Sequence, residues 1–442
     1  MDKRILHYMW LSNALYAGST AVKTLFAYFK DIHSIYEAEK EDYKNAGLKT
    51  EEIIRLCNKD LSIVETQYKY CKREKIGFLC FDDPYYPERL KIINNPPCMF
   101  YYRGKLLHID DYPCFAFVGT RKCSEDGFRF AYRTAYTASA QGAVIVNGLA
   151  DGIDGACIAA ALDANGYAIG VLGSGIDRIY PEKNRELFYR LSASGLIITE
   201  FPPFTEPKAE NFPIRNRVIS GLCLATAIFE ADAYRSGAMI SARHALEQGR
   251  GIFAVPGSPD DSRYSGPLEL IKDGANVLTE AEDMLCEYSL LFPHRLNMRH
   301  VPSIPAELMN KHMERCFENK TGKKAYNKTH SKKKHETVVK ENISTSTEEK
   351  TDTASTSSEN VSVSESIITE KTASNTAAPK IDMSLLSATE KQIADLFLEY
   401  NELSADDISA KGFKIDDVLS SITLLEVYGY IQAIPGGRYK LS

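Results

Sequence analysis

Glycine, hydroxyl and arginine side chains follow the apolar run that ends at Val118. Gly119 allows the backbone to approach a ligand closely, Thr120 supplies a hydroxyl group, and Arg121 can donate two hydrogen bonds to a phosphate. Ser124 stands where a helix is expected to begin, and the amide groups of a helix N-terminus attract anions. The segment predicts a phosphate contact, although a tight turn with a surface arginine would contain the same residues.

A second glycine-containing loop follows the apolar run that ends at Leu172. Its Gly173 and Gly175 begin like a dinucleotide fingerprint, but Arg178 occupies the position of the third glycine. A nicotinamide dinucleotide is therefore not expected here, whereas phosphate contact by the backbone amides of the loop remains plausible. Lys183 could add positive charge to the same region.

Two arginines flank an asparagine in the segment Asn211-Phe-Pro-Ile-Arg-Asn-Arg217. The candidate ligands in and near it are Arg215, Asn216, Arg217 and the upstream Phe201. Cationic donors beside aromatic rings suit a single nucleic-acid strand, because each phosphate has a charge and each base a π-face. Alternatively, one of the two arginines forms a structural salt bridge with Glu200 or Glu230, and we expect the other to be exposed.

Ser236 and Gly237 mark one more expected helix start that could bind an anion. In open α/β sheets such loops meet at the carboxyl ends of the strands, where ligands bind. The sequence therefore predicts a single basic cleft formed by several loops that bind nucleic-acid phosphates.

No set of catalytic or metal-binding residues emerges from the sequence. His244 lies within an expected helix with no nucleophile motif nearby. Asp151 and Asp154 could suggest a metal pair, but one of them is expected to cap a helix, and Asp154 fits an N-terminal helix position. The ten cysteines are scattered singly, without zinc-ligand spacing. We predict no catalytic residues, no metal and no cofactor.

Apolar, β-branched runs alternate with helical segments between residues 112 and about 285, which predicts an α/β domain with a parallel sheet covered on both faces. The expected strands are Cys114–Val118, Ala143–Val146, Ala168–Leu172, Leu196–Thr199, Ala225–Phe229, Ile252–Val255 and Asn276–Leu278. The expected helices include Phe128–Gln141, Asp154–Leu162, Asn184–Ser194 and Gly237–Gln248.

The flanking regions differ from this core. We expect a helical domain over 1–80, a proline-rich connector over 81–111, the α/β domain over 112–290, a disordered linker over 291–383 and a compact domain over 384–442. Three helices and a hairpin in the last domain suggest a winged-helix-like fold. Its five Lys and Arg against nine Asp and Glu give a net charge of −4, which opposes contact with phosphates and makes a protein contact at least as plausible.

The formal net charge of the 442-residue chain is −6, so a nucleic-acid site would have to be a local basic patch. The sequence shows neither a signal peptide nor an apolar stretch that could span a bilayer. We therefore expect a cytoplasmic protein with no membrane partner.

With its glycine- and arginine-containing loops taken together, the sequence resembles the DNA-processing protein DprA/Smf family. The resemblance rests on segments that occur in family order over about 112–280: Val118-Gly-Thr-Arg, Gly148-Leu-Ala-Asp-Gly-Ile-Asp154, Gly173-Ser-Gly-Ile-Asp-Arg-Ile-Tyr-Pro181, Glu200-Phe-Pro-Pro203, Asn211-Phe-Pro-Ile-Arg-Asn-Arg217, Arg235-Ser-Gly237, Ala245-Leu-Glu-Gln-Gly249 and Val255-Pro-Gly-Ser258. The chain departs from the family where Asn147, Cys157 and Leu268 replace the common serine, histidine and asparagine.

The resemblance implies an extended Rossmann-like core with a helical N-terminal domain and a winged-helix-like appendage. It also implies a protein without enzymatic activity that binds single-stranded DNA, forms a homodimer and helps to load the RecA recombinase during natural transformation. Carried over by motif, Gly119, Thr120, Arg121 and Ser124 would hold phosphates, with Gly173, Lys183, Phe201 and Arg215 as further candidates.

Two alternatives remain open. A related Rossmann-like group contains nucleotide phosphoribohydrolases, whose glycine-rich motif supplies a catalytic glutamate beside a phosphate site. The nearest counterpart here, Arg235-Ser-Gly-Ala-Met-Ile-Ser241, has no glutamate at that spacing. A nucleotide-sensing regulator with the same core is the other alternative.

Overall fold

The computed structural model describes residues 1–234, 236–298, 304–325, 388–400, 402–427, 430–434 and 438–441. The chain divides into two compact units, Met1–Thr337 and Val338–Ser442. None of the helices in these described ranges is both long and apolar enough to cross a membrane.

Short helices form the N-terminal part of the first unit, as expected. They are α1 (Lys3–Ala14), α2 (Ala21–Tyr28), α3 (Ile32–Glu37), α4 (Lys40–Asn45), α5 (Thr50–Leu56) and α6 (Ser62–Arg73). The Asp2 side chain caps α1 by accepting hydrogen bonds from the backbone N–H groups of Arg4 and Ile5. Apolar side chains of α1 such as Met9 and Leu11 are fully buried, so the helices share the core of the first unit.

A nine-stranded sheet follows, in the order β1-β2-β6-β5-β4-β3-β7-β8-β9. The strands are β1 (Gly77–Cys80), β2 (Met99–Gly104), β3 (Cys114–Val118), β4 (Val144–Asn147), β5 (Ala168–Val171), β6 (Leu196–Thr199), β7 (Ala225–Ile228), β8 (Gly251–Ala254) and β9 (Asn276–Val277). Strands β3 to β9 pair in parallel, which confirms the predicted parallel core.

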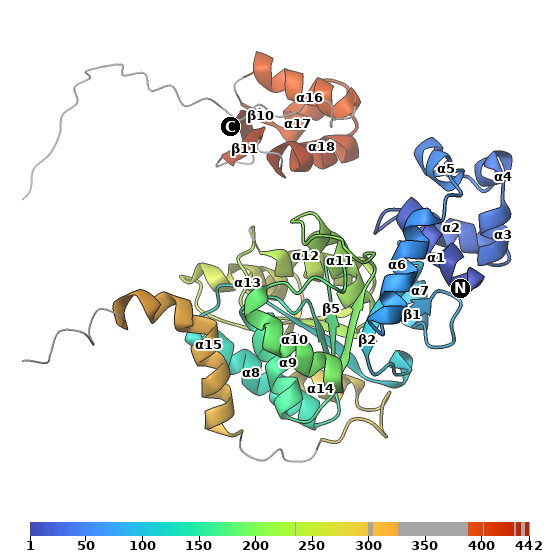
Figure 1. Ribbon diagram of the computed structural model, residues 1–442. Helices are drawn as coiled ribbons and strands as arrows, with labels where there is room; N and C mark the ends of the chain where they lie inside the picture. Colours follow the sequence, from blue (N-terminus) through green and yellow to red (C-terminus); the bar gives the residue numbers. More distant parts are fainter. Residues whose placement is uncertain are drawn as a thin grey trace, which may run out of the picture. The chain divides into compact units, whose positions relative to one another are not determined.

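Helices cover both faces of this sheet (Figure 1). Alternation along β3 shows why both faces are apolar, since Phe115 and Phe117 belong to one core cluster and Ala116 and Val118 to the other. The first face is covered by α8 (Glu125–Ala140), α9 (Ile153–Asp163), α10 (Arg185–Ser194) and α14 (Ala281–Tyr288). The second is covered by α7 (Glu88–Lys91), α11 (Asn211–Gly221), α12 (Gly237–Glu247) and α13 (Ser265–Lys272). Single turns of 3-10 helix lie at Ile109–Asp111, Glu182–Asn184 and Ser262–Tyr264.

The prediction that residues 81–111 form only a connector is wrong in part, because this segment contributes a strand to the sheet. Strand β2 pairs antiparallel with both β1 and β6, so two antiparallel strands extend the parallel core at one edge. Strand β1 comes from the end of the region expected to be purely helical.

The prediction of a disordered linker over 291–383 is also wrong for the first part of that segment. Helix α15 (Ala306–Ala325) packs against α8 and α9, and its Met309 and Met313 contact the first core cluster. The remainder of that segment, from residue 326 to 383, lies outside the described residues.

The second unit contains α16 (Ala388–Glu399), α17 (Ala405–Ser409), α18 (Ile415–Val427) and a sheet of β10 (Leu403–Ser404), β11 (Ile431–Ile434) and β12 (Arg438–Leu441). The strand order is β10-β12-β11. The core of the second unit includes the buried side chains of Ile393, Phe397 and Leu425. Three helices and the expected hairpin are therefore present, while the winged-helix assignment stays a prediction.

Candidate functional site

A cavity of about 390 Å³ opens where the loops after β3, β4 and β7 meet the start of α11. It is lined by Val118, Gly119, Thr120, Arg121, Lys122, Ala150, Asp154, Phe212, Pro213, Arg215, Asn216, Ile219, Ser236, Gly237, Ala238, Ile240 and Ser241. Seven predicted site residues are among them: Gly119, Thr120, Arg121, Arg215, Asn216, Ser236 and Gly237. The carboxyl edge of the parallel sheet thus brings these residues together, as the sequence predicts.

The loop after β3 forms one wall of the cavity. A Cβ atom on Gly119 would lie 2.6 Å from Cγ1 of Ile153, so only glycine lets this loop approach α9 so closely. The Thr120 amide donates to the carbonyl oxygen of Glu230 at 2.6 Å. Arg121 is exposed, and its guanidinium lies over the Phe212 ring, 5.0 Å from the ring centroid. A cation and an aromatic face are therefore presented side by side.

Ser124 shapes this loop and does not line the cavity. Its Oγ accepts a hydrogen bond from the Gly127 amide at 2.9 Å, which makes Ser124 the N-cap of α8. The carboxylate of Glu230, which is 1% exposed, accepts hydrogen bonds from the backbone amide of Ser124 at 2.8 Å and from its hydroxyl group. Glu230 therefore fixes the loop through both its backbone and its side chain.

Replacing Ser124 by alanine is expected to lower the free energy of unfolding by about 2 kcal/mol, because the N-cap is lost and a buried carboxylate loses a donor. Urea unfolding followed by circular dichroism measures this loss. Ser192→Ala is the matched control, since that exposed hydroxyl donates only to a carbonyl of its own helix. Equal urea midpoints for the two variants would contradict the assigned role of Ser124.

Arg215 lies in the wall of the cavity with only 5% of its surface exposed. Its guanidinium donates to the carbonyl oxygens of Gly148, at 3.1 Å, and Val171. Burial lowers the pKa of Arg215 to about 10, the Asp154 carboxylate opposes this shift, and Arg121 adds to it. These hydrogen bonds fix the arginine in the wall of the cavity, where its charge adds to that of Arg121.

Arg217 does not belong to the site. It is 2% exposed, and its guanidinium donates to both carboxylate oxygens of Glu200 at 2.8 Å. The Gly18 amide donates to the same carboxylate at 3.4 Å, so this ion pair lies where the N-terminal helices meet the α/β core. The expected salt bridge is confirmed, but the expectation that the other arginine is exposed is wrong, since Arg215 is buried as well.

The N-terminus of α12 forms the opposite wall. The Ser236 side chain accepts a hydrogen bond from the Ala238 amide at 3.3 Å, and Asn216 donates to the carbonyl oxygen of Gly237 at 3.1 Å. No atom would lie within 4 Å of a Cβ on Gly237, so the start of this helix faces open space. The dipole of this helix favours an anion there. Arg235 lies outside the described residues.

Four further predicted residues lie outside the cavity. The Phe212 ring lies close against Gly173, because a Cβ there would lie 2.8 Å from Cδ1 of that ring. Gly175 packs against the backbone of Pro202, and Phe201 is buried. Lys183 lines a separate cavity beside α15 and donates to the carbonyl oxygen of Cys316 at 2.7 Å.

The described residues contain no group of three or more His, Cys, Asp or Glu side chains that could hold a metal ion. Asp154 is the carboxylate that lines the cavity, and its Oδ2 accepts a hydrogen bond from the Gly148 amide at 3.0 Å. Burial raises the pKa of Asp154, and the nearby Arg215 opposes that shift. The arrangement can bind an anion and stack an aromatic group.

Comparison with known proteins identifies the family of this chain. Residues 77–289 match the family described as DNA recombination-mediator protein A. The chain is 42% identical over 211 residues to Protein Smf of Synechocystis, covering 47% of this chain and 53%, about half, of that relative. It is 37% identical over 216 residues to the DNA processing protein DprA of Bacillus subtilis, covering 49% of this chain and 72% of the relative. The chain belongs to the DNA recombination-mediator protein A family.

A solved structure of the same family shows the same fold. The X-ray structure of DNA processing protein A from Streptococcus pneumoniae superposes with a TM-score of 0.56 at 31% identity. The superposition covers 64% of this chain and 97% of the other. The extended Rossmann-like fold expected for the family is therefore confirmed. Helix α15 lies beyond the residues that match the family.

Sequence reasoning missed Phe212, Lys122 and Asp154 as residues of the site. Phe212 stands three residues before Arg215, and on a helix this spacing places both side chains on one face. That spacing is a signal that could have identified the ring, whose centroid is 5.9 Å from the Arg215 guanidinium carbon. Lys122 is exposed directly beside Arg121, which adds a further positive charge at the mouth of the cavity.

Proposed function

We propose that this protein binds single-stranded DNA in the cavity between the loop after β3 and the N-terminus of α12, and that it acts in DNA processing. The observation that carries the proposal is the exposed Arg121 over the Phe212 ring, with Arg215 near the same ring in the lining of the cavity. Arg121 and the α12 amides would hold phosphates, and Phe212 would stack on a base. The name of two relatives, DNA processing protein, supports the same role.

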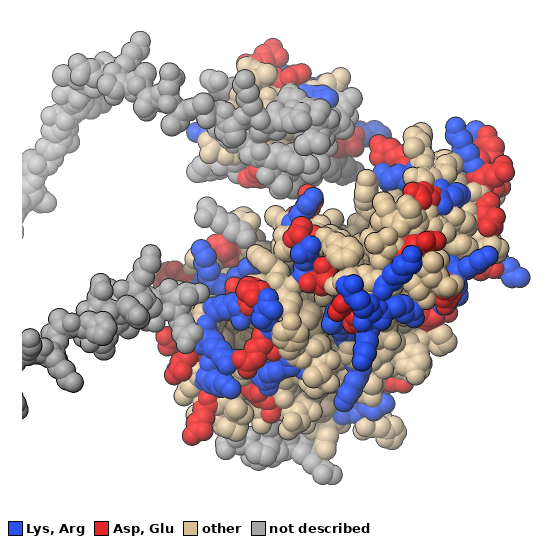
Figure 2. Space-filling view, viewed as in Figure 1, with Lys and Arg blue, Asp and Glu red and all other residues tan. Residues whose placement is uncertain are grey.

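The charge distribution favours phosphate binding at one local site. Over much of the face shown in Figure 2, Lys and Arg side chains are mixed with Asp and Glu, as expected for a chain with a formal net charge of −6. Phosphate binding would therefore be concentrated in the cavity, where Arg121, Lys122 and Arg215 gather against one carboxylate, Asp154. A single strand can expose both phosphates and base faces to such a site, whereas a duplex hides its base faces in the stack.

Membership of the family extends the proposal to partners. We propose that the protein acts in the cytoplasm as a homodimer and helps to load the RecA recombinase onto the bound strand during natural transformation. The acidic second unit, with a net charge of −4 from residue 384 onward, suits contact with a protein better than contact with DNA. Light scattering and co-purification with RecA test these two partners separately.

The competing function is that of a nucleotide phosphoribohydrolase, and Asp154 is the observation that favours it, because a carboxylate lines the cavity. Asp154 is only 6% exposed and accepts a backbone hydrogen bond, which suits a structural role better than proton transfer. Release of a free base from nucleoside monophosphates would establish the enzyme. Tight binding of free nucleotides by calorimetry, without turnover, would establish a sensing regulator.

Fluorescence anisotropy with the full chain tests DNA binding directly. Labelled oligo-dT, the matching duplex and thymidine monophosphate are compared at two salt concentrations. We expect oligo-dT to bind more tightly than the other two ligands, with an affinity that falls as salt rises, because phosphate contacts release counterions. Equal affinity for the duplex, or for the mononucleotide, would overturn the proposal.

A further inference from the structure

A groove runs along α8, on the face of the sheet opposite to α11 and α12. Two adjoining hollows form it, and both are lined by Phe130, Arg133 and Thr279. The first hollow, of about 630 Å³, lies between α8 and the loop after β8. The second, of about 440 Å³, lies between α8 and the start of α14. Because the two hollows share these residues, the groove is continuous along α8.

The half of the groove beside the loop after β8 is basic. Arg129 and Arg133 line it against one carboxylate, Asp126. Arg133 is exposed and Arg129 is half-buried, and neither guanidinium forms an ion pair or a side-chain hydrogen bond with another residue that the structure describes. Glu280 and Glu282 line the other half, so an anion is favoured only in the half beside the loop after β8.

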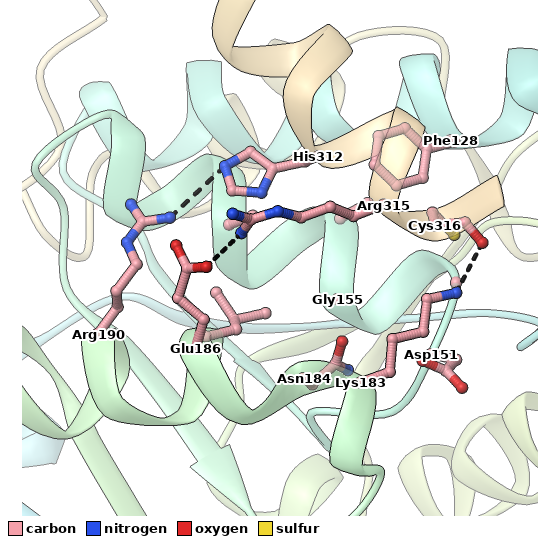
Figure 3. A pocket seen from close by; sticks show the side chains of 14 residues that line it. Phe128, Asp151, Gly155, Lys183, Asn184, Glu186, Arg190, His312, Arg315 and Cys316 are labelled. Carbon is pink, nitrogen blue, oxygen red and sulfur yellow. Dashed lines mark hydrogen bonds and ion pairs between the residues drawn. The ribbon is translucent and has the colours of Figure 1, made fainter. Parts of the chain in front are cut away.

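The cavity beside α15 differs from this groove, because its cationic side chains already have partners (Figure 3). Lys183 donates to the carbonyl oxygen of Cys316 at 2.7 Å. Arg315 pairs with Glu186, also at 2.7 Å. A ligand there would have to displace these contacts, whereas the two arginines of α8 can bind an anion without losing a partner.

Aromatic rings line the groove beside these arginines. The guanidinium carbon of Arg133 lies 6.0 Å from the centroid of the Phe130 ring. Tyr264, which follows β8, is half-buried in the groove, and a Cβ atom on Gly257 would overlap its ring. The loop after β8 therefore packs directly against this ring. An exposed arginine beside an aromatic ring is also what Arg121 presents in the cavity, so both surfaces suit the same kind of ligand.

The loop after β7 connects the groove with the cavity proposed for DNA. The Thr120 amide donates to the carbonyl oxygen of Glu230 at 2.6 Å. The amide of the next residue, Ala231, donates to the carbonyl oxygen of Arg263, also at 2.6 Å. Thr120 lines the cavity, and Arg263 directly precedes Tyr264 of the groove. Two successive residues of one loop thus join the two walls, so a strand that leaves the cavity over this loop meets the groove.

We propose that the basic half of this groove is a second contact site for the DNA strand that is bound in the cavity. This inference rests on the proposed DNA binding and assigns the path of the strand across the carboxyl edge of the sheet. Arg129 and Arg133 each donate to a phosphate, since they lie one helical turn, about 6 Å, apart along α8. Tyr264 stacks on a base. An acidic peptide offers carboxylates to the same arginines but no bases to stack on Tyr264, so a nucleic acid fits the groove better.

Anisotropy titrations of the full chain with oligo-dT strands of about 4 to 16 nucleotides test this path. The affinity of the unmodified chain should rise with strand length once the strand reaches the groove. Arg129→Ala combined with Arg133→Ala should weaken binding of the longest strand about 10- to 100-fold and leave the shortest unchanged, whereas Arg121→Ala should weaken every length. With the longest strand, the salt slope of the double variant should fall by about 0.7 for each of the two phosphates.

The matched control combines Arg73→Ala with Arg185→Ala, which removes an equal charge from exposed ion pairs outside the groove and the cavity. Equal affinity of this control and the α8 double variant for the longest strand would overturn the second site. A loss of affinity that accompanies a change of oligomeric state in light scattering would instead assign the groove to a contact between copies of the chain. Competition by oligo-glutamate as strong as by unlabelled oligo-dT would assign it to an acidic protein segment, and either result overturns the proposal.

Arginine modification by phenylglyoxal, mapped by peptide mass, gives a second readout that needs no variant. The longest strand should protect Arg129 and Arg133, and the shortest should protect Arg121 alone. Modification of the two α8 arginines that is unaffected by the longest strand would contradict the proposal. If no strand binds at any length, the proposed DNA binding itself is refuted, whereas binding that does not depend on length refutes only the second site.

Discussion

Replacing Arg217 by alanine is expected to lower the free energy of unfolding by about 3–5 kcal/mol, because the buried Glu200 carboxylate then lacks the cation that pairs with it. Arg217 is among the largest side chains that are fully buried in this chain, and Glu200 is 9% exposed. The loss should also loosen the attachment of the N-terminal helices, since the Gly18 amide donates to Glu200, and a Cβ on Gly18 would lie 3.1 Å from Cγ2 of Ile214.

Urea unfolding followed by circular dichroism measures the effect, and limited proteolysis reports release of the N-terminal helices. Arg185→Ala is the matched control, because Arg185 pairs with Glu182 on the surface with both side chains more than half exposed. A surface pair of this kind contributes little to stability, because solvent and salt screen it. If both variants unfold at the same urea concentration, the Arg217–Glu200 pair does not have the structural role assigned to it.

The parallel core could be predicted from the sequence because its strands are continuous apolar runs. The edge strands could not, since β2 follows Pro96 and Pro97 and begins in a segment that reads as irregular, and its pairing with β6 depends on a tertiary contact. Helix α11 begins with Asn211-Phe-Pro. Proline is tolerated in the first turn of a helix, so the proline alone could not show whether a helix begins here. Helix α15 was missed because its charged stretch is stabilised by docking on α8 and α9.

The loops of the candidate site could be predicted, but the roles of their side chains could not. Parallel strands bring their carboxyl ends to one edge, which is a property of the fold. Whether Arg215 or Arg217 turns toward the cavity depends on the position of Glu200, which lies on a different segment. Lys183 is separated from the cavity by its contact with α15, a helix that the sequence did not predict. Such partners are fixed by tertiary packing alone.

Replacing Arg121 by alanine is expected to weaken binding to oligo-dT by about 10- to 100-fold, because a charge-assisted hydrogen bond to a phosphate contributes about 1.5–3 kcal/mol. The logarithm of the affinity should also fall less steeply with the logarithm of the salt concentration, by about 0.7 for each phosphate charge that is no longer neutralised. The free energy of unfolding should be nearly unchanged, because Arg121 is exposed and its contact with the Phe212 ring lies at the surface.

Anisotropy titrations at several salt concentrations measure both quantities, with the same Arg185→Ala variant as the control, since it removes an equal charge outside the cavity. Phe212→Ala separates the two parts of the proposed site. Losing the ring should weaken binding while leaving the salt slope near that of the unmodified chain, because stacking releases no counterions. An unchanged affinity and salt slope in Arg121→Ala would place the phosphate contact elsewhere. A reduced slope in Phe212→Ala would show instead that the ring acts mainly by positioning Arg121.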